Sequence, residues 1–91
     1  MIKTIGFENL EELSEVLGIY DENLTYLTRE LGILAYVDGM KIKLEGDQEG
    51  VTLGGSVLLA LIEIVRKGER VDEGKLVYAL ELAKEGRAEE I

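Results

Sequence analysis

The stretch that decides the fold spans residues 18–46 and reads GIYDENLTYLTRELGILAYVDGMKIKLEG. Its first half contains Leu24, Leu27 and Leu31, whose spacing places them on one face of a short helix. Gly32 follows and is expected to end that helix, because a residue without Cβ adopts the left-handed C′ conformation with little strain. The stretch therefore predicts a turn, an amphipathic helix and a glycine stop before the periodicity of the chain changes.

The second half of this stretch predicts a hairpin of two strands. Residues 33–37 form a short apolar run, which is interrupted by Asp38-Gly39, a dipeptide preferred in two-residue type I′ turns. Residues 40–45 then alternate between apolar and charged side chains, as expected of a strand with one buried face. This alternation gives two sets of side chains, with Met40, Ile42 and Leu44 on one face and Lys41, Lys43 and Glu45 on the other.

A strand and an acidic helix are predicted before this stretch. Residues 2–7 read as a strand, and Asn9 with Glu12 three residues later resembles a capping box at the start of a helix. We expect Gly18 to end this helix and the carboxylate of Asp21 to cap the next one. The first helix carries two sets of side chains, with Leu10, Leu13 and Leu17 expected to face the core and Glu8, Glu11, Glu12 and Glu15 expected to face water.

Two further helices are predicted after the hairpin. The first begins at Gly46-Asp47, and its run VLLALIEIV at 57–65 marks it as the most buried helix. Gly54-Gly55 lies inside it, so either a neighbour comes close there, or the helix kinks or begins later. Asp72 is expected to cap the last helix, which ends near Gly86 and directs one set of side chains inward, namely Leu76, Ala79, Leu80 and Ala83.

Composition restricts the classes of function. The chain has 91 residues, of which 46% are hydrophobic, enough for one small domain with a single core. It contains neither Cys nor His, which removes disulfides, thiolate metal sites and the usual general base near neutral pH. Adjacent carboxylates such as Glu11-Glu12 point apart on a helix, so they form no ready catalytic pair. We therefore expect no enzyme activity, no metal and no cofactor.

Two further classes are not expected from the sequence. The run GVTLGGS at 50–56 lacks the lysine of a P-loop, so it does not predict a nucleotide site. No stretch approaches the ~20 apolar residues that a membrane span needs, and the N-terminus lacks the pattern of a secretory signal. The sequence thus favours a cytoplasmic protein without a membrane partner.

The order of these elements resembles a KH-type fold. The segments that carry the resemblance are GIYDENL at 18–24, the helix ending at Gly32, the Asp38-Gly39 hairpin and the step LEGD at 44–47. Together with VDEGKLVYALELAKEG at 71–86, they are similar to the N-terminal domain of PhoH-like proteins, which are phosphate-starvation-associated ATPases. The resemblance implies a KH type I-like βααββα fold with an additional C-terminal helix and a three-stranded sheet covered by helices on one face. It also implies one KH-like domain at 1–86, and a frayed tail at 87–91 leading toward an ATPase domain.

The resemblance further implies a groove for single-stranded RNA, bordered by the two helices that flank the first loop and by the middle strand. The residues implied are Gly18, Ile19 and Tyr20 in the loop, Leu34 and Tyr36 on one strand, and Lys41 and Lys43 on the next. Only Gly18 matches the G-x-x-G loop of KH domains, because Asp21 occupies the second glycine position and no cation lies between them.

The charge of the chain leaves two functions open. Acids outnumber bases 19 to 10, which gives a formal net charge of −9, whereas affinity for nucleic acid depends mainly on cations that neutralise phosphates. The first hypothesis is an RNA-binding module of a larger PhoH-like ATPase. The second is a protein-interaction or homo-oligomerisation module with a KH-like shape and no nucleic-acid binding.

Overall fold

The computed structural model describes residues 1–86, whose elements follow the order β-α-α-β-β-α-α. The strands are β1 (Ile2–Gly6), β2 (Leu34–Asp38) and β3 (Lys41–Glu45). The helices are α1 (Leu10–Leu17), α2 (Glu22–Leu31), α3 (Gln48–Arg66) and α4 (Glu73–Lys84), with a short 3₁₀ helix, η1 (Ile19–Asp21), between α1 and α2. The α+β class and the KH-like order predicted from the sequence are confirmed, whereas the tail predicted at 87–91 lies outside the described residues.

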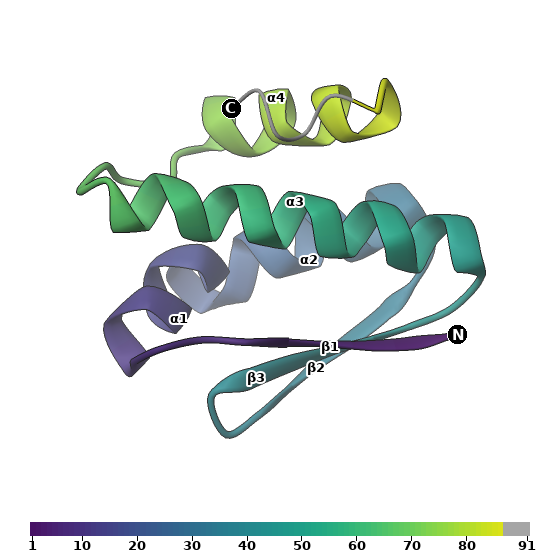
Figure 1. Cartoon of the computed structure of the whole chain (residues 1–91), viewed down its shortest axis with the longest axis horizontal. Helices are drawn as coiled ribbons and strands as arrows, with labels where there is room; N and C mark the ends of the chain where they lie inside the picture. Colours follow the sequence, from purple (N-terminus) through teal and green to yellow (C-terminus); the bar gives the residue numbers. More distant parts are fainter. Residues whose placement is uncertain (87–91) are drawn as a thin grey trace.

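The strands form one antiparallel sheet in the order β1-β3-β2, so β3 is central and β1 and β2 are its edges. In the register of the sheet, Lys43 lies between Thr4 of β1 and Tyr36 of β2. Figure 1 shows α1, α2 and α3 on one side of this sheet, and α4 stacked on the side of α3 that is remote from the sheet. Within residues 1–86, no helix covers the other face, which we call the outer face.

The core lies between the inner face of the sheet and α3. Ile42 and Leu44 of β3 are fully buried, and they contact a helix that is itself buried along most of its length. Among the helices of residues 1–86, α3 is the one that could cross a membrane by length and hydropathy, but 56% of the window concerned is buried inside the protein, as expected of the core helix of a small domain. The prediction that α3 is the most buried helix is consistent with this arrangement.

The paired glycines of α3 are explained by a close neighbour. A Cβ atom added to Gly54 would lie 3.1 Å from Cδ1 of Ile33 and 3.1 Å from Cδ1 of Leu44. The helix nevertheless runs without interruption through this position. Of the explanations that the sequence left open, the close approach of a neighbour is therefore the correct one.

Two of the three predicted helix caps, Asn9 and Asp72, are present, and Asp47 caps α3 in the same way. The side chains of Asn9, Asp47 and Asp72 accept hydrogen bonds from backbone N–H groups three residues further on, at 2.8, 3.1 and 2.8 Å. The prediction for Asp21 is wrong, because this residue takes the left-handed conformation at φ 59° and its side chain makes no capping hydrogen bond. A capping carboxylate needs an extended backbone at its own residue, and the turn before α2 does not provide it.

The burial predicted for α1 is wrong at two positions. Leu10 is 68% exposed, whereas Glu12, expected to face water, is only 4% exposed. The buried side of α1 is formed by Glu12, Leu13 and Val16, so the helix is rotated relative to the leucine stripe. Burial of Glu12 is tolerated because Arg66 of α3 donates to both of its carboxylate oxygens.

The hairpin turn also differs in detail from the prediction. Asp38 pairs with Lys41, so the two-residue loop consists of Gly39 and Met40 rather than Asp38 and Gly39. Gly39 has φ 63°, and Met40 does not have a positive φ. This pattern matches a type II′ turn, in which glycine occupies the first central position, rather than type I′.

Candidate nucleic-acid interface

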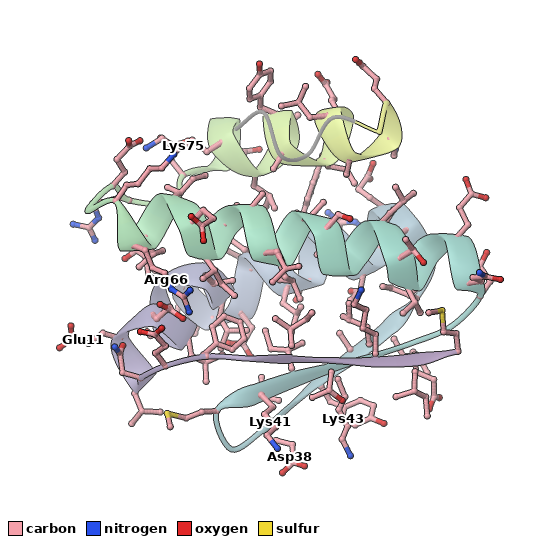
Figure 2. The ribbon with its side chains drawn as sticks, in the orientation of Figure 1. Glu11, Asp38, Lys41, Lys43, Arg66 and Lys75 are labelled. Atoms are coloured by element: carbon pink, nitrogen blue, oxygen red, sulfur yellow. The ribbon has the colours of Figure 1, made fainter. Side chains whose placement is uncertain are left out.

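The outer face of the sheet brings together four of the seven residues that the sequence implicated. The register places Leu34 beside Glu45, Tyr36 beside Lys43 and Asp38 beside Lys41. Because side chains alternate along a strand, these six side chains project from one face. Figure 2 shows Lys41, Lys43 and Asp38 pointing away from the helices. The strand residues implicated by the resemblance therefore lie on the uncovered face of the sheet.

The sequence analysis missed the contribution of β1 to this face. Register pairs Ile2 with Glu45 and Thr4 with Lys43, so both side chains join the outer face from the opposite edge. Ile2 and Leu34 are 62% and 64% exposed, on either side of Glu45. The alternation within residues 2–7 carries this signal, but only the strand order β1-β3-β2 shows which residues become neighbours.

The charges of the outer face are mixed rather than basic. Nζ of Lys43 lies 3.9 Å from Oδ2 of Asp38, and both side chains are exposed to solvent. Lys41 has no ion pair within the described residues, and Glu45 adds a second carboxylate to the face. Exposed ion pairs contribute only ~0–1 kcal/mol, so Lys43 can exchange its partner for another anion at little cost.

The other three implicated residues lie in the loop between α1 and α2. Gly18 has φ 80°, and a Cβ atom added there would lie 2.7 Å from Nδ2 of Asn23, so the position requires glycine. Nδ2 of Asn23 in turn donates to the carbonyl of Val16 at 3.1 Å, which fixes the end of α1 against the start of α2. Tyr20 projects from this junction with 97% of its surface exposed.

The backbone of the loop is strained at two consecutive residues. Tyr20 and Asp21 have φ values of 53° and 59°, in the left-handed region that residues with a Cβ rarely adopt. Such residues cost of order 1–3 kcal/mol each and persist only where the surroundings hold them in place. The loop is therefore a rigid turn that presents one tyrosine to solvent.

The structure does not bring the loop and the outer face together. Gly18 and Ile19 line a depression of about 300 Å³ together with residues 70–73, which connect α3 to α4. That connection lies on the helical side of the protein, away from the outer face. The groove implied by the family resemblance is thus divided into a loop region and a sheet region.

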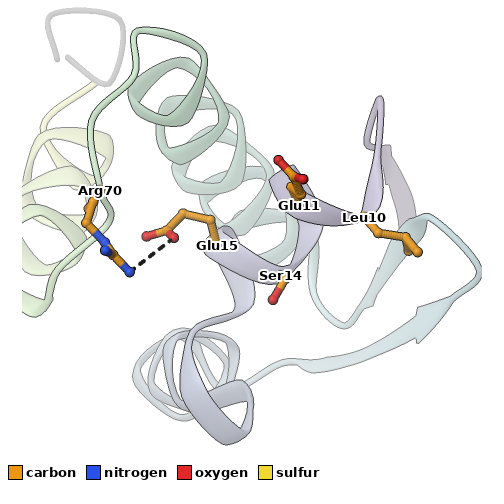
Figure 3. A pocket seen from close by; sticks show the side chains of 5 residues that line it. All are labelled: Leu10, Glu11, Ser14, Glu15 and Arg70. Carbon is orange, nitrogen blue, oxygen red and sulfur yellow. Dashed lines mark ion pairs between the residues drawn. The ribbon is translucent and has the colours of Figure 1, made fainter.

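The surroundings of the loop are acidic. The depression beside the loop is also lined by Glu15, Glu22, Asp72 and Glu73, with Arg70 as its only cation among the described residues. Figure 3 shows the neighbouring surface of α1, where Arg70 reaches toward Glu15 and Glu11 faces solvent. Arg70 and Glu15 form an ion pair at 4.0 Å, and Val71 also donates its backbone N–H to Glu15 at 3.0 Å. This side of the protein repels polyanions.

An ion pair between the buried carboxylate of Glu12 and the partly exposed guanidinium of Arg66 joins α1 to α3 and was not predicted. Nε of Arg66 donates to Oε2 of Glu12 at 3.0 Å, and Glu8 lies 3.3 Å from the same guanidinium. The hydrogen bond from Arg66 lowers the pKa of Glu12 below the ordinary value of 4.5, and burial opposes this shift only in part. The pair occupies the guanidinium of Arg66, so this cation contributes to packing rather than to an anion site.

No metal centre accompanies these features. Within residues 1–86, no three carboxylates come close enough to hold a metal ion. The cations without an ion pair in this part of the chain are scattered over several elements, namely Lys3, Arg29, Lys41, Lys67 and Lys84. Lys41 and Lys43 are therefore the cations that the register places together beside an exposed aromatic side chain.

Comparison with known proteins identifies one relative. No protein-family model matches the chain, and no solved structure matches it. The chain is 27% identical over 82 residues to the PhoH-like protein of Bacillus subtilis (strain 168), an alignment that covers 90% of this chain. The alignment covers 26% of the relative, so the chain spans about a quarter of the length of the curated protein it matches. These residues and their α+β order therefore make the chain a distant homologue of one part of a PhoH-like protein.

Proposed function

We propose that this domain binds single-stranded RNA weakly on the outer face of its sheet, as a non-catalytic module of a PhoH-like ATPase. The observation that carries the proposal is the pairing of Tyr36 with Lys43 on a sheet face that no helix covers. The relation to a PhoH-like protein and the KH-like order of elements support the same class of function.

The chemistry of this pair suits a single strand rather than a duplex. A base that stacks on an exposed tyrosine gains ~1–3 kcal/mol without demanding a particular sequence. Lys43 and Lys41 lie beside that ring on the central strand and can each neutralise a phosphate of the same strand. The nearby ion pair between Lys43 and Asp38 is exposed and weak enough to be exchanged for a phosphate contact.

The net charge sets the strength of this binding. A chain with a formal charge of −9 repels RNA at long range, so affinity must come from local contacts. With two phosphates neutralised, the logarithm of the association constant should fall against the logarithm of salt concentration with a slope of about −1.4. The isolated domain is therefore expected to bind weakly and to gain affinity when tethered within a larger protein.

The first test uses charge reversal on the outer face. Fluorescence anisotropy would follow a labelled, mixed-sequence RNA of about ten nucleotides, a length in the usual range for small single-strand binders. Lys41→Glu/Lys43→Glu should abolish binding at low salt. The control Lys67→Glu/Lys84→Glu changes the net charge equally, on the helical side of the protein, and should retain most of the affinity. Absence of wild-type binding at the lowest salt, or an equal loss in both double variants, would refute the proposal.

A second test isolates the stacking contact. Tyr36→Ala should weaken binding about tenfold, the factor that corresponds to ~1.4 kcal/mol of lost stacking. Tyr78→Ala is the matched control, because Tyr78 is a similarly exposed tyrosine on α4. Equal affinity of the Tyr36 variant and the wild type would show that RNA, if bound, uses another surface.

A protein-interaction module is the second candidate function. The specific observation in its favour is the exposure of Ile2 and Leu34 in one row of the outer face. Exposed apolar side chains grouped on one face are typical of protein contacts. A domain that fails to bind RNA at low salt but binds a protein through Leu34 would establish this alternative.

A further inference from the structure

The hydrogen bonds at the ends of the sheet reveal which backbone groups of β3 bond to which neighbour. The N–H of Phe7 donates to the carbonyl of Met40 at 2.9 Å. The N–H of Gly46 donates to the carbonyl of Met1 at 3.1 Å, and the terminal amine of Met1 donates back to Gly46 at 2.8 Å. These bonds follow the register that pairs Ile42 with Ile5. Even-numbered residues of β3 are therefore the ones bonded to β1.

The opposite side of β3 then bonds to β2 through its odd-numbered residues. In an antiparallel ladder, successive residues direct their backbone groups alternately to the two sides of the strand. The hydrogen-bonded pairs of the hairpin are thus Tyr36 with Lys43, Leu34 with Glu45 and Asp38 with Lys41. It follows that Ala35 and Val37 direct their N–H and C=O groups outward from the edge of the sheet. No hydrogen bond outside the sheet reaches either residue in the described part of the chain.

The outward groups of β2 lie in the middle of an edge strand whose one charge, Asp38, stands at its last residue. Residues 33–37 read ILAYV, with no charge, proline or glycine, and four of the five residues of β2 are exposed. Natural edge strands normally carry a charge, a proline or a bulge that blocks pairing with another strand. The other edge, β1, carries its charge, Lys3, inside the strand and on the inner face, whereas Asp38 of β2 lies at the strand's end and on the outer face.

We propose that β2 pairs antiparallel with β2 of a second copy of this chain and forms a continuous six-stranded sheet. The outward backbone groups fit this partner. A two-fold axis at Tyr36 places Ala35 of each copy opposite Val37 of the other. Both contacts are hydrogen-bonded pairs, since both residues direct their backbone groups outward. The two copies of Tyr36 then face each other on the outer face as a close, non-hydrogen-bonded pair, an arrangement favourable for aromatic side chains.

The charges at the contact are compatible with this register, although the net charges of the two copies repel each other. Antiparallel pairing about Tyr36 places the two copies of Asp38 at opposite ends of the contact, so no like charges meet within it. Each copy nevertheless has a formal charge of −9. Added salt screens this repulsion, so dimerisation should strengthen with salt. RNA binding should weaken with salt, and the two activities therefore respond in opposite directions.

The test is a proline substitution that removes only an outward donor. Val37→Pro deletes the N–H that the dimer uses but leaves the bonds between β2 and β3 in place, a position where edge strands tolerate proline. Sedimentation velocity over a range of protein concentrations should show a weak wild-type dimer that is favoured by salt. Val37→Pro should weaken it about tenfold or more, because the two-fold axis doubles the loss of each hydrogen bond.

Thr4→Pro is the matched control, because Thr4 directs its N–H outward from the β1 edge. It should leave the dimer unchanged. If Val37→Pro lowers the melting temperature, Val37→Lys is used as the test variant instead. A lysine on the inner face of an edge strand reaches water in the monomer but blocks pairing with a second strand. In amide exchange, Ala35 and Val37 should gain protection with increasing concentration.

Three results would overturn the proposal. They are a wild-type protein that stays monomeric at high salt, a dimer that responds equally to Val37→Pro and Thr4→Pro, and concentration-dependent protection at β1 in place of β2. None of these results decides whether the domain binds RNA. RNA binding is tested separately by the charge reversals at Lys41 and Lys43, which leave the outward backbone groups of β2 intact.

Discussion

Lys43 and Leu44 are neighbours in the sequence but belong to opposite faces of the central strand. Leu44 is fully buried under α3, and Lys43 reaches solvent on the outer face. The inner face contributes Leu44 and Ile42 to the core, whereas no helix of residues 1–86 packs on the outer face. Adjacent residues also differ in burial on α1, where Glu11 is exposed and Glu12 is buried, and in backbone conformation at the start of α2, where φ is 59° at Asp21 and −61° at Glu22. Each pair provides an internal control.

The largest effect is expected for the pair on β3. Leu44→Ala should lower the free energy of unfolding by about 3 kcal/mol, because it removes buried methyl groups and leaves a cavity beneath α3. Lys43→Ala should change it by less than about 0.5 kcal/mol, as usual for an exposed position. Urea denaturation of both variants measures the difference. A small effect at Leu44 would mean that the sheet and α3 do not share one core.

The next effect is a dependence on pH that separates Glu12 from Glu11. Because Arg66 lowers the pKa of Glu12 in the folded protein, this ion pair stabilises the fold above the ordinary glutamate pKa of 4.5. That contribution is lost as the pH falls below this value and through the lower pKa of the folded state. Glu12→Gln should flatten this part of the stability profile, measured by denaturation at several pH values.

Glu11→Gln is the control for this measurement, since Glu11 lies on the exposed side of the same helix. Its stability profile should keep the slope of the wild type. Equal slopes for both variants would contradict a stabilising ion pair between Glu12 and Arg66.

The smallest effect concerns the strained turn. Asp21→Gly should raise the free energy of unfolding by about 0.5 kcal/mol, because glycine adopts φ 59° without a Cβ clash and this gain exceeds its greater freedom in the unfolded chain. Glu22→Gly, at the first residue of α2 with φ −61°, should be destabilising by ~0.5–1 kcal/mol. Thermal melts of both variants would show opposite shifts. Shifts of the same sign would exclude strain at Asp21.

Local signals in the sequence predicted most of the fold. The caps at Asn9 and Asp72, the stop at Gly32 and the alternation in β3 each depend on residues close together in the chain, and the structure confirms them. The error in the burial of α1 has a nonlocal cause. Glu12 is buried because Arg66, 54 residues further on, reaches it, and the helical periodicity of α1 carries no sign of that partner.

The candidate site was less accessible to sequence reasoning. Tyr36, Lys41 and Lys43 could be assigned to one face from alternation, and the register places them there. The distance from that face to the loop at Gly18 depends on how α1 packs on α3, which no short motif encodes. The left-handed backbone at Tyr20 and Asp21 was also not foreseeable, because both residue types usually occupy other conformations. The role of these residues in binding remains a prediction.

The position of β3 has a consequence for molecular recognition. The backbone of β3 is hydrogen-bonded on both sides, and α3 packs on its inner face. We therefore expect β3 to be among the last segments of the chain to open in hydrogen exchange. Lys41 and Lys43 project from this least mobile element. A ligand bound there would contact a strand whose main chain is already ordered, so association would restrict side-chain motion rather than the backbone.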